Sequence, residues 1–447
     1  MMYLEFSNWK VLRRAALICC LGVVTGAAAE PEPAKTGSAI FFHIDGAGIS
    51  HWQAARMLMA GPDGEIHWDK IPHVALYRGH QKDTLTTSSN AGATAHAYGV
   101  KVPHASFSTD GTGRRPLAPS GYRRSIMEEA QARGLAVGVV NSGSAVEPGT
   151  ACFLVSAESR SQNADIVARQ LESGVEVILA GGEEWYLPEG VEGRHGKGLR
   201  TDGRNLVEEA KEAGYQVVFT QEELAALPSK AGKVLGIFAT QDTFNDESEE
   251  KLAAKGLPLY DPDSPTIAQM TTAALRFLSG RRFFLVVEEE GPDNFGNYNN
   301  APGVMEALRR ADEGLGVALE FVERHPDTLL ITFADSEAGN PDIIGLRGSD
   351  FEKEMLASGR DRNGAPLDGM VRSESGGIKR PFASQPDRAG RIHRFVIAWG
   401  SQLDTYGAIL VRAAGLNAQK VSGTFDNTQL YPLLSQTLFG ESLAPAE

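Results

Sequence analysis

Short apolar runs alternate with longer amphipathic segments along most of this 447-residue chain. One amphipathic segment, 304–324, carries apolar residues at helical spacing, at Leu308, Leu315, Leu319 and Val322. The apolar runs have the length of buried strands and lie at 39–43, 137–141, 175–180, 234–238, 283–287, 329–333 and 395–399. Because alternating strands and helices favour a parallel sheet covered on both faces, we predict a three-layer α/β/α fold with a large, mostly parallel central sheet.

The start of the chain has a different composition from the rest. Residues 1–29 combine a basic beginning, a short apolar run and small residues, which predicts a signal peptide and an exported protein, periplasmic or secreted. Only Cys152 follows this segment, so no intrachain disulfide is expected. No other apolar segment is long enough to suggest a membrane span.

The remaining chain is interpreted as one catalytic domain over 38–441, after a linker at 30–37. Within it, 336–392 is long, polar and rich in Gly, Asp, Arg and Ser, which predicts a surface excursion near the site. The segment 424–440 is expected to form a loop that leads into a closing helix.

Acidic residues outnumber basic ones, and the formal net charge is -14. This charge argues against nucleic acid as a partner. An acidic protein can still bind an anionic substrate where its carboxylates hold metal ions, because the ions reverse the local charge.

Three predicted strands lead directly into acidic residues, namely Asp45, Glu288 and Asp335. The carboxyl ends of parallel strands lie on one edge of a sheet, which is where open α/β sheets bind ligands. Carboxylates gathered there repel one another unless cations hold them, and magnesium prefers such oxygen ligands. For any one of these acids alone, a loop residue or a helix cap is the simpler interpretation. All three together, with Asp293 five residues after Glu288, favour a shared metal site.

The stretch 86–101 begins with hydroxyl residues and continues with small ones. Small residues let a backbone approach a ligand closely, and a helix that begins there points free N–H groups at an anion. A serine in this position is a candidate nucleophile or phosphate ligand. The alternative is an ordinary N-cap on an Ala/Gly-rich helix.

These segments resemble those of the alkaline phosphatase family, in the same order. The Asp-Gly-Ala-Gly sequence at 45–48 is similar to the Asp-Gly-Met-Gly that ends the family's first strand. The family's nucleophile signature is matched up to Thr94 and continues into Gly-Val-Lys at 99–101, which places the nucleophile at Ser89. Further similar segments are 165–171, 177–182, 201–207, 283–288 and 328–335.

The resemblance implies a function and a set of roles. It implies an alkaline-phosphatase-like fold, hydrolysis of small phosphate monoesters, a divalent-metal centre and a homodimer. Ser89 would be transiently phosphorylated and Arg160 would clamp the phosphate with its planar guanidinium. The implied metal ligands are Asp45, shared between zinc and magnesium; Glu288, with either Glu147 or Thr150, for magnesium; Asp293 for the first zinc; and Asp335 for the second.

The zinc histidines of the family are missing from this chain. Ser336 follows Asp335 where the family has a histidine, and Asn297 stands four residues after Asp293 where a second is expected. The setting of the third corresponds to Asp-Arg-Ala-Gly at 387–390, so Arg388 would place a fixed positive charge where a metal ligand stands.

None of the ten histidines falls at these positions. His393 is interpreted as a packing or surface residue. His43 lies on the same strand face as Asp45. It could contact the metal ligands without binding the metal, or it could be an ordinary buried histidine. Smaller departures flank the nucleophile, with Ser88 in place of Asp and Asn90 in place of a small residue.

The loss of imidazoles changes the expected metals. Zinc prefers nitrogen and sulfur, whereas an oxygen set suits magnesium, calcium or manganese. The magnesium position is expected to be intact and both zinc positions impaired.

Two functions follow from this pattern. One is an exported phosphomonoesterase that works through a phosphoserine with divalent-metal assistance. The other is a catalytically impaired relative that binds phosphate or a phosphorylated ligand. Diester or sulfate ester hydrolysis has less support, because Ser89 lacks the Cys/Ser-x-Pro-x-Arg setting of sulfatases.

Overall fold

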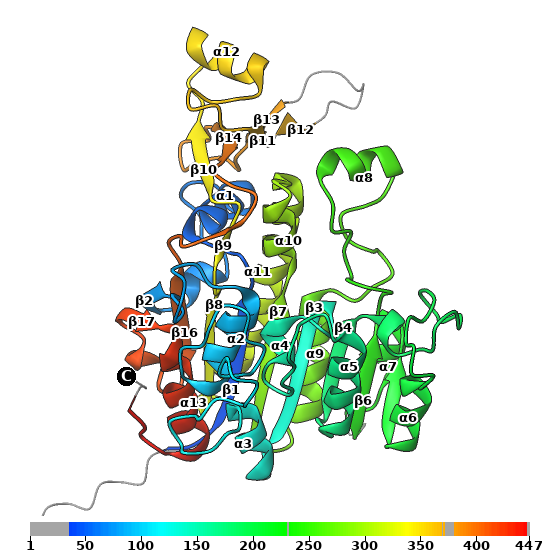
Figure 1. Ribbon diagram of the computed structural model, residues 1–447. Coiled ribbons are helices and arrows are strands. Elements are labelled where there is room, and N and C mark those ends of the chain that lie inside the picture. The colour runs from blue at the N-terminus through cyan, green and yellow to red at the C-terminus, as the bar shows by residue number, and fades with distance from the viewer. Residues whose placement is uncertain (1–34, 230–231, 369, 372–379, 445–447) are drawn as a thin grey trace, which may run out of the picture. The chain divides into compact units, whose positions relative to one another are not determined.

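Strands from the whole length of the chain pair into one ten-stranded sheet (Figure 1). The computed structural model describes residues 35–229, 232–368, 370–371 and 380–444. The predicted signal peptide, 1–29, and most of the predicted linker lie outside the described residues. The strand order is β17 (Gly423–Asp426), β2 (His73–Arg78), β16 (Leu410–Gly415), β8 (Thr328–Phe333), β1 (Ser38–Ile44), β7 (Phe283–Glu289), β3 (Ala136–Ser144), β4 (Val177–Gly181), β6 (Lys233–Ile237) and β5 (Tyr215–Val218).

This sheet confirms the predicted fold class. Neighbouring strands run parallel except at β16, which is antiparallel to both β2 and β8. Every predicted strand except 395–399 belongs to the sheet. The three central strands β1, β7 and β8 are buried along their whole length, as the continuous apolar runs indicated.

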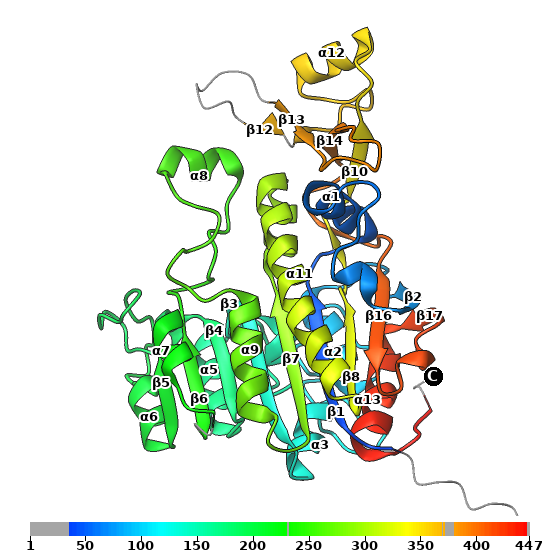
Figure 2. The same ribbon diagram turned by 180° about the vertical axis from the view of Figure 1, so that it is seen from behind.

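Helices cover both faces of the sheet. Figure 1 shows α2, α3, α4 and α13 in front of it, and Figure 2, from behind, shows α9 and α11 on the opposite face. The long α11 confirms the helical pattern predicted for 304–324. The helices are α1 (Ile49–Met59), α2 (Ser89–Tyr98), α3 (Ile126–Ala132), α4 (Pro148–Ala151), α5 (Asn163–Glu172), α6 (Leu206–Glu212), α7 (Gln221–Ala226), α8 (Glu249–Lys255), α9 (Ile267–Leu278), α10 (Gly291–Asn297), α11 (Ala301–Arg324), α12 (Asp350–Ser358) and α13 (Leu430–Phe439).

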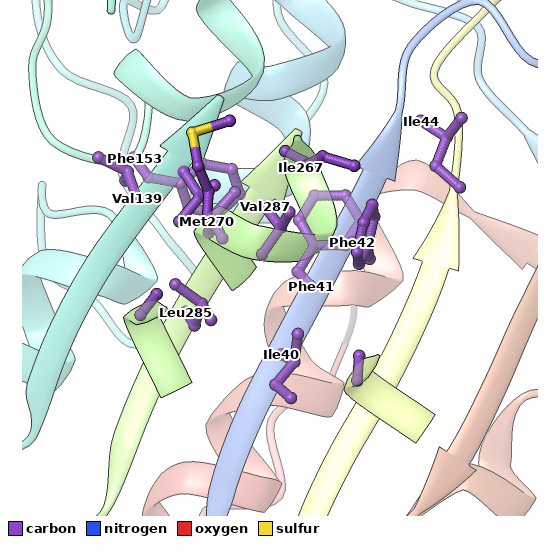
Figure 3. Close-up of a cluster of buried hydrophobic side chains, with 14 of the residues drawn as sticks. Ile40, Phe41, Phe42, Ile44, Val139, Phe153, Ile267, Met270, Leu285 and Val287 are labelled. Carbon is purple, nitrogen blue, oxygen red and sulfur yellow. The ribbon is translucent and has the colours of Figure 1, made fainter. Parts of the chain in front are cut away.

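Side chains packed between the layers hold the central strands in place. On one face of β1, the Phe41 ring lies 4.9 Å from that of Phe333 in β8. On the other face, Phe42 lies with Ile267 and Met270 of α9 in one apolar cluster (Figure 3). Since β1 is packed from both sides, the residues at its carboxyl end are held in fixed positions.

The segment 395–399 is a strand, but its placement in the main sheet was wrong. It forms β14 (Arg394–Trp399), which pairs antiparallel with β10 (Pro341–Gly345) in a second, five-stranded sheet. The other strands of this sheet are β11 (Leu367–Asp368), β12 (Met370–Val371) and β13 (Arg380–Ala383). An apolar run has the same composition in either sheet, so its partners could not be read from the pattern alone.

Four strands of the second sheet, β10 to β13, lie within 336–392, the segment that was predicted to be a surface excursion, and β14 follows it directly. The backbone N–H of Gln385 donates to the carbonyl of Met57 in α1 over 2.9 Å, which ties the segment to the main body. At its start, β9 (Glu337–Ala338) pairs with β15 (Asp404–Thr405). No helix among the described residues combines the length and apolar content that a bilayer span requires.

Candidate active site

The candidate site is built where neighbouring strands of the main sheet end. The register places His43 of β1, Glu288 of β7 and Asn141 of β3 in one row across the sheet. Asp45 follows the end of β1, and Asp335 extends beyond the end of β8. The structure thus brings the three predicted strand-end acids to one edge.

Asp45 and Asp335 present oxygen atoms that no neighbour satisfies. Both residues are buried, and none of their four carboxylate oxygens has a hydrogen-bond partner among the described residues. Burial, reinforced by the charge of Asp45, raises the pKa of Asp335 well above its ordinary value. Buried carboxylates normally have partners, so this pair is suited to a bound cation.

Glu288 is held by hydrogen bonds on both of its oxygens. Its Oε1 lies 2.8 Å from Nδ1 of His43, and its Oε2 accepts from the side-chain amide of Asn141. The same amide lies 3.0 Å from Oγ1 of Thr150 in α4. Burial raises the pKa of Glu288, although His43 opposes the shift. The structure therefore links Glu288 to Thr150 through one amide.

Glu147 lies on the other side of this group, at the N-cap of α4, and pairs with Arg160. The distance from Arg160 Nη2 to Glu147 Oε2 is 3.1 Å. Burial raises the pKa of Glu147 to about 8 against the opposing effect of Arg160. The Arg160 side chain is 53% exposed, so its guanidinium can still meet a ligand that enters from solvent.

Asp293 and Asn297 lie one helical turn apart in α10 and meet a residue that the sequence did not identify. The Asn297 amide donates to Oδ2 of Asp293 over 3.3 Å and to Oδ1 of Asp404 over 2.9 Å. Burial and the charge of Asp404 raise the pKa of Asp293 well above its ordinary value. Oδ1 of Asp293 and Oδ1 of Asn297 are buried without a partner in the described part of the chain.

Ser89 is the first residue of α2 and is buried. Its neighbour Ser88 is the N-cap, whose Oγ accepts from the N–H of Ala91 over 3.3 Å. The cap and the candidate nucleophile are therefore different residues. The first turn of α2 lies against Asp335, because a Cβ added at Gly92 would be 2.4 Å from Oδ2 of that carboxylate.

Ser336 and Arg388, both predicted near the metals, have different surroundings in the structure. Ser336 is buried directly after Asp335, before β9 begins. Arg388 is exposed in the loop between β13 and β14, and its N–H donates to Asp63 over 2.8 Å. This hydrogen bond ties the loop to the turn after α1, and the replacement of a metal ligand by Arg388 remains a prediction. His393 is exposed and contacts Asp387 at 3.0 Å, as expected of a surface residue.

Asp404 and Glu290 are site residues that sequence reasoning missed. Asp404 lies on the two-residue strand β15, which no apolar pattern marks. Glu290 follows β7 directly, and burial together with Glu147 raises its pKa well above the ordinary value. Its position after Glu288 and Glu289 was a signal that could have been used. The buried acids of the region include Asp45, Glu288, Glu289, Glu290, Asp293 and Asp335.

This arrangement can hold divalent cations. The donors are mostly carboxylate oxygens, which suits magnesium, manganese or calcium. His43, Asp45 and Glu288 offer ligand atoms that all lie within 4.8 Å of one another. A hydroxyl at a helix N-terminus and a guanidinium at the rim complete a setting in which a phosphate could be bound.

Comparisons with known proteins agree with this setting. The chain is 25% identical to streptomycin-6-phosphate phosphatase of Streptomyces griseus, over 97% of this chain and 98% of that protein. It is 27% identical to the alkaline phosphatase of Escherichia fergusonii, over 92% of this chain and 87% of that protein. These similarities extend over both the main sheet and the site.

The fold is similar to solved alkaline phosphatases. The structure from Thermus thermophilus matches with a TM-score of 0.68 at 23% identity, over 96% of this chain and 98% of that one. The structure from the Antarctic bacterium TAB5 matches with a TM-score of 0.67 at 18% identity, over 91% and 98%. The family model for alkaline phosphatase matches residues 38–438. The chain therefore belongs to the alkaline phosphatase family, a family of phosphoric monoester hydrolases.

Proposed function

We propose that this protein hydrolyses phosphate monoesters with Ser89 as the nucleophile. The observation that carries the proposal is the contact between the first turn of α2 and the Asp335 carboxylate, which brings the candidate nucleophile to the acidic cluster. Family membership supports the reaction class.

The N-terminus of α2 and Arg160 would bind the phosphoryl group. The first N–H groups of a helix have no partner within the helix, and they attract an anion. The Arg160 guanidinium carries two further donors in a fixed plane, and it lies at the exposed side of the cluster. Together they would orient phosphorus in front of the Ser89 hydroxyl.

The carboxylates fit divalent cations, because buried oxygens of Asp45, Asp293 and Asp335 have no partners within the described residues. Asp45, Glu288 and Thr150 would hold one cation, with Glu147 as the alternative to Thr150. Asp293, Asn297 and Asp404 would hold another, and Asp335 with Asp45 a third. When bound, such cations supply positive charge that favours ionisation of a hydroxyl and stabilises a leaving oxygen.

The proposed reaction has two balanced steps. In the first, the Ser89 oxygen forms a bond to phosphorus, the ester P–O bond breaks, and the alcohol leaves with the proton that Ser89 gave up. In the second, water attacks the phosphoserine and the Ser89–phosphorus bond breaks. Inorganic phosphate departs, and one proton of the water returns to Ser89.

The test is an assay of the purified protein with p-nitrophenyl phosphate, after metal removal and with magnesium, manganese, calcium and zinc added separately. We expect turnover with at least one metal and its loss in Ser89→Ala. Equal turnover by Ser89→Ala would reject the proposal.

A second function is favoured by one specific contact. The Asn297 amide donates to both Asp293 and Asp404. It therefore stabilises negative charge on these carboxylates that would otherwise attract a cation. Ser336, next to Asp335, lacks the imidazole of relatives. A protein that binds phosphate without turnover would show heat of phosphate binding in calorimetry and no hydrolysis with any of the four metals.

We further propose that the protein is exported and forms a homodimer. Export rests on the leader-like composition of 1–29, and it predicts that N-terminal sequencing of the native protein begins after Ala29. The dimer rests on the family resemblance alone, and light scattering of the purified protein would test it.

A further inference from the structure

His43 is a fully buried imidazole inside the acidic cluster. It lies two residues before Asp45 on β1, so both side chains point to the same face of the sheet. In the register, it stands beside Glu288 of β7. The imidazole is therefore surrounded by carboxylates that belong to three different strands or strand ends: Asp45, Glu288 and Asp335.

The two ring nitrogens of His43 have different surroundings. Nδ1 lies 2.8 Å from Oε1 of Glu288, a distance at which it donates to the carboxylate. Nε2 lies 3.9 Å from Oδ1 of Asp335, which is too long for a hydrogen bond, and it has no other partner in the described structure. In the neutral imidazole, donation from Nδ1 to Glu288 selects the tautomer that has a lone pair on Nε2.

Two carboxylates near the His43 ring are also without partners. Both oxygens of Asp45 and both oxygens of Asp335 are buried with no hydrogen bond among the described residues. Five unsatisfied polar atoms in one buried group are unusual, because buried polar atoms are nearly always paired. A cation bound between these three side chains would satisfy Nε2 and one oxygen of each carboxylate.

The packing around His43 holds the ring in this orientation. Phe41 lies 5.7 Å away and His96 5.8 Å away, measured between ring centroids. His96 itself is engaged, since its Nε2 is 2.8 Å from the hydroxyl of Tyr77. His43 is thus the imidazole that is both fixed and open towards Asp45 and Asp335.

We propose that Nε2 of His43 is the nitrogen ligand of the cation held by Asp45 and Asp335, with Glu288 as the carboxylate that orients the ring. A metal-binding histidine usually donates its other ring N–H to a carboxylate, which is the arrangement of His43 and Glu288. The inference rests on the metal centre of the proposed function. It assigns to β1 the imidazole that is absent at Ser336, and it makes this position selective for zinc, iron or nickel over magnesium or manganese.

The test is X-ray absorption spectroscopy of metal-free protein loaded with one equivalent of zinc. Wild type is expected to show the outer-shell scattering of a coordinated imidazole, and His43→Asn is expected to lose it. The matched control is His73→Asn, which removes a histidine from β2 outside the site and should retain the signal. Zinc affinity should fall tenfold or more in His43→Asn and stay within about twofold of wild type in His73→Asn.

Wild-type protein that binds zinc without imidazole scattering would overturn the inference, as would an unchanged signal in His43→Asn. If His43→Asn does not fold, His43→Gln takes its place, because its amide can still donate to Glu288. The Ser89→Ala variant separates this inference from the proposed function, since it should lose turnover and keep the imidazole signal. If wild-type protein turns over substrate but shows no imidazole scattering, His43 is not a ligand and the proposed function still holds.

Discussion

Gly92 and Asp335 are in direct contact, although they lie 243 positions apart in the sequence. A Cβ at position 92 would lie 2.4 Å from Oδ2 of Asp335 and 2.7 Å from its Cβ. No carbon can occupy that space, so only glycine lets the helix that carries Ser89 approach the acidic edge of the sheet this closely. The contact joins the two halves of the candidate site.

Gly92→Ala is expected to weaken both the fold and metal binding. Overpacking costs about 1–3 kcal/mol in free energy of unfolding, which exceeds the roughly 1 kcal/mol that alanine gains in a helix. Because the clash displaces Asp335, affinity for divalent metal should also fall. Chemical denaturation and metal titration measure the two effects.

Gly280→Ala is the control for this prediction. Its added Cβ meets nothing within 4 Å, and its φ is not positive. The variant should be as stable as wild type or slightly more so. Equal stability and equal metal affinity in Gly92→Ala would contradict the close approach of α2 to Asp335.

Arg160→Ala is expected to reduce kcat/KM on the order of a hundredfold, because it removes donors to the transferred phosphoryl group. Competitive inhibition by inorganic phosphate should weaken with it. Arg160→Lys keeps the charge and should recover only part of the loss, since an ammonium lacks the planar pair of donors. If the lysine variant matched wild type, the arginine would act through charge alone.

Asp404→Asn is expected to lower metal affinity roughly tenfold while the protein stays folded. Asp404 lies 2.9 Å from the Asn297 amide and adds its charge beside Asp293. Asp387→Asn provides the control, because Asp387 lies in the second-sheet loop with His393. Equilibrium dialysis with zinc or manganese distinguishes them, and equal affinities would remove Asp404 from the site.

The metal-free protein is expected to lose stability as pH rises from about 5 to 8. Burial raises the pKa of Glu147 to about 8 and that of Glu289 to about 7, and it raises those of Asp293 and Asp335 further above their ordinary values. Unfolded carboxyls titrate near pH 4, so in this window the folded state holds more protons, and stability falls with pH.

Calorimetry in the presence of a chelator measures this slope as a decrease in Tm. Added magnesium should raise Tm more at pH 8 than at pH 5, because only ionised carboxylates bind it. Asp335→Asn removes one carboxyl whose pKa is raised, so Tm should decrease less steeply with pH in this variant. A metal-free protein whose Tm rises between pH 5 and 8 would contradict the carboxylate cluster.

Much of the fold could be predicted because the central strands are buried on both faces. Continuous apolar runs at β1, β7 and β8 then carry the signal by themselves. The strand-end acids were also visible, because one sheet edge collects every residue that follows a parallel strand. The run that became β14 failed because its composition does not reveal its partners.

The rest of the site depends on pairings that leave no local signal. Asp404 reaches Asp293 through the short pairing of β15 with β9, and two residues are too few for a pattern. His43 looked like a core histidine, and only the unsatisfied atoms around Nε2 distinguish it.

The most direct test of the account is to trap the phosphorylated protein. Metal-loaded protein is mixed with p-nitrophenyl phosphate, quenched in acid and digested, and the peptides are analysed by mass spectrometry. We predict one phosphoryl group on the peptide that contains Ser89, absent in Ser89→Ala, with turnover at least roughly a thousandfold lower in that variant. Turnover with no phosphoryl group on Ser89, or with one on another residue, would contradict the account.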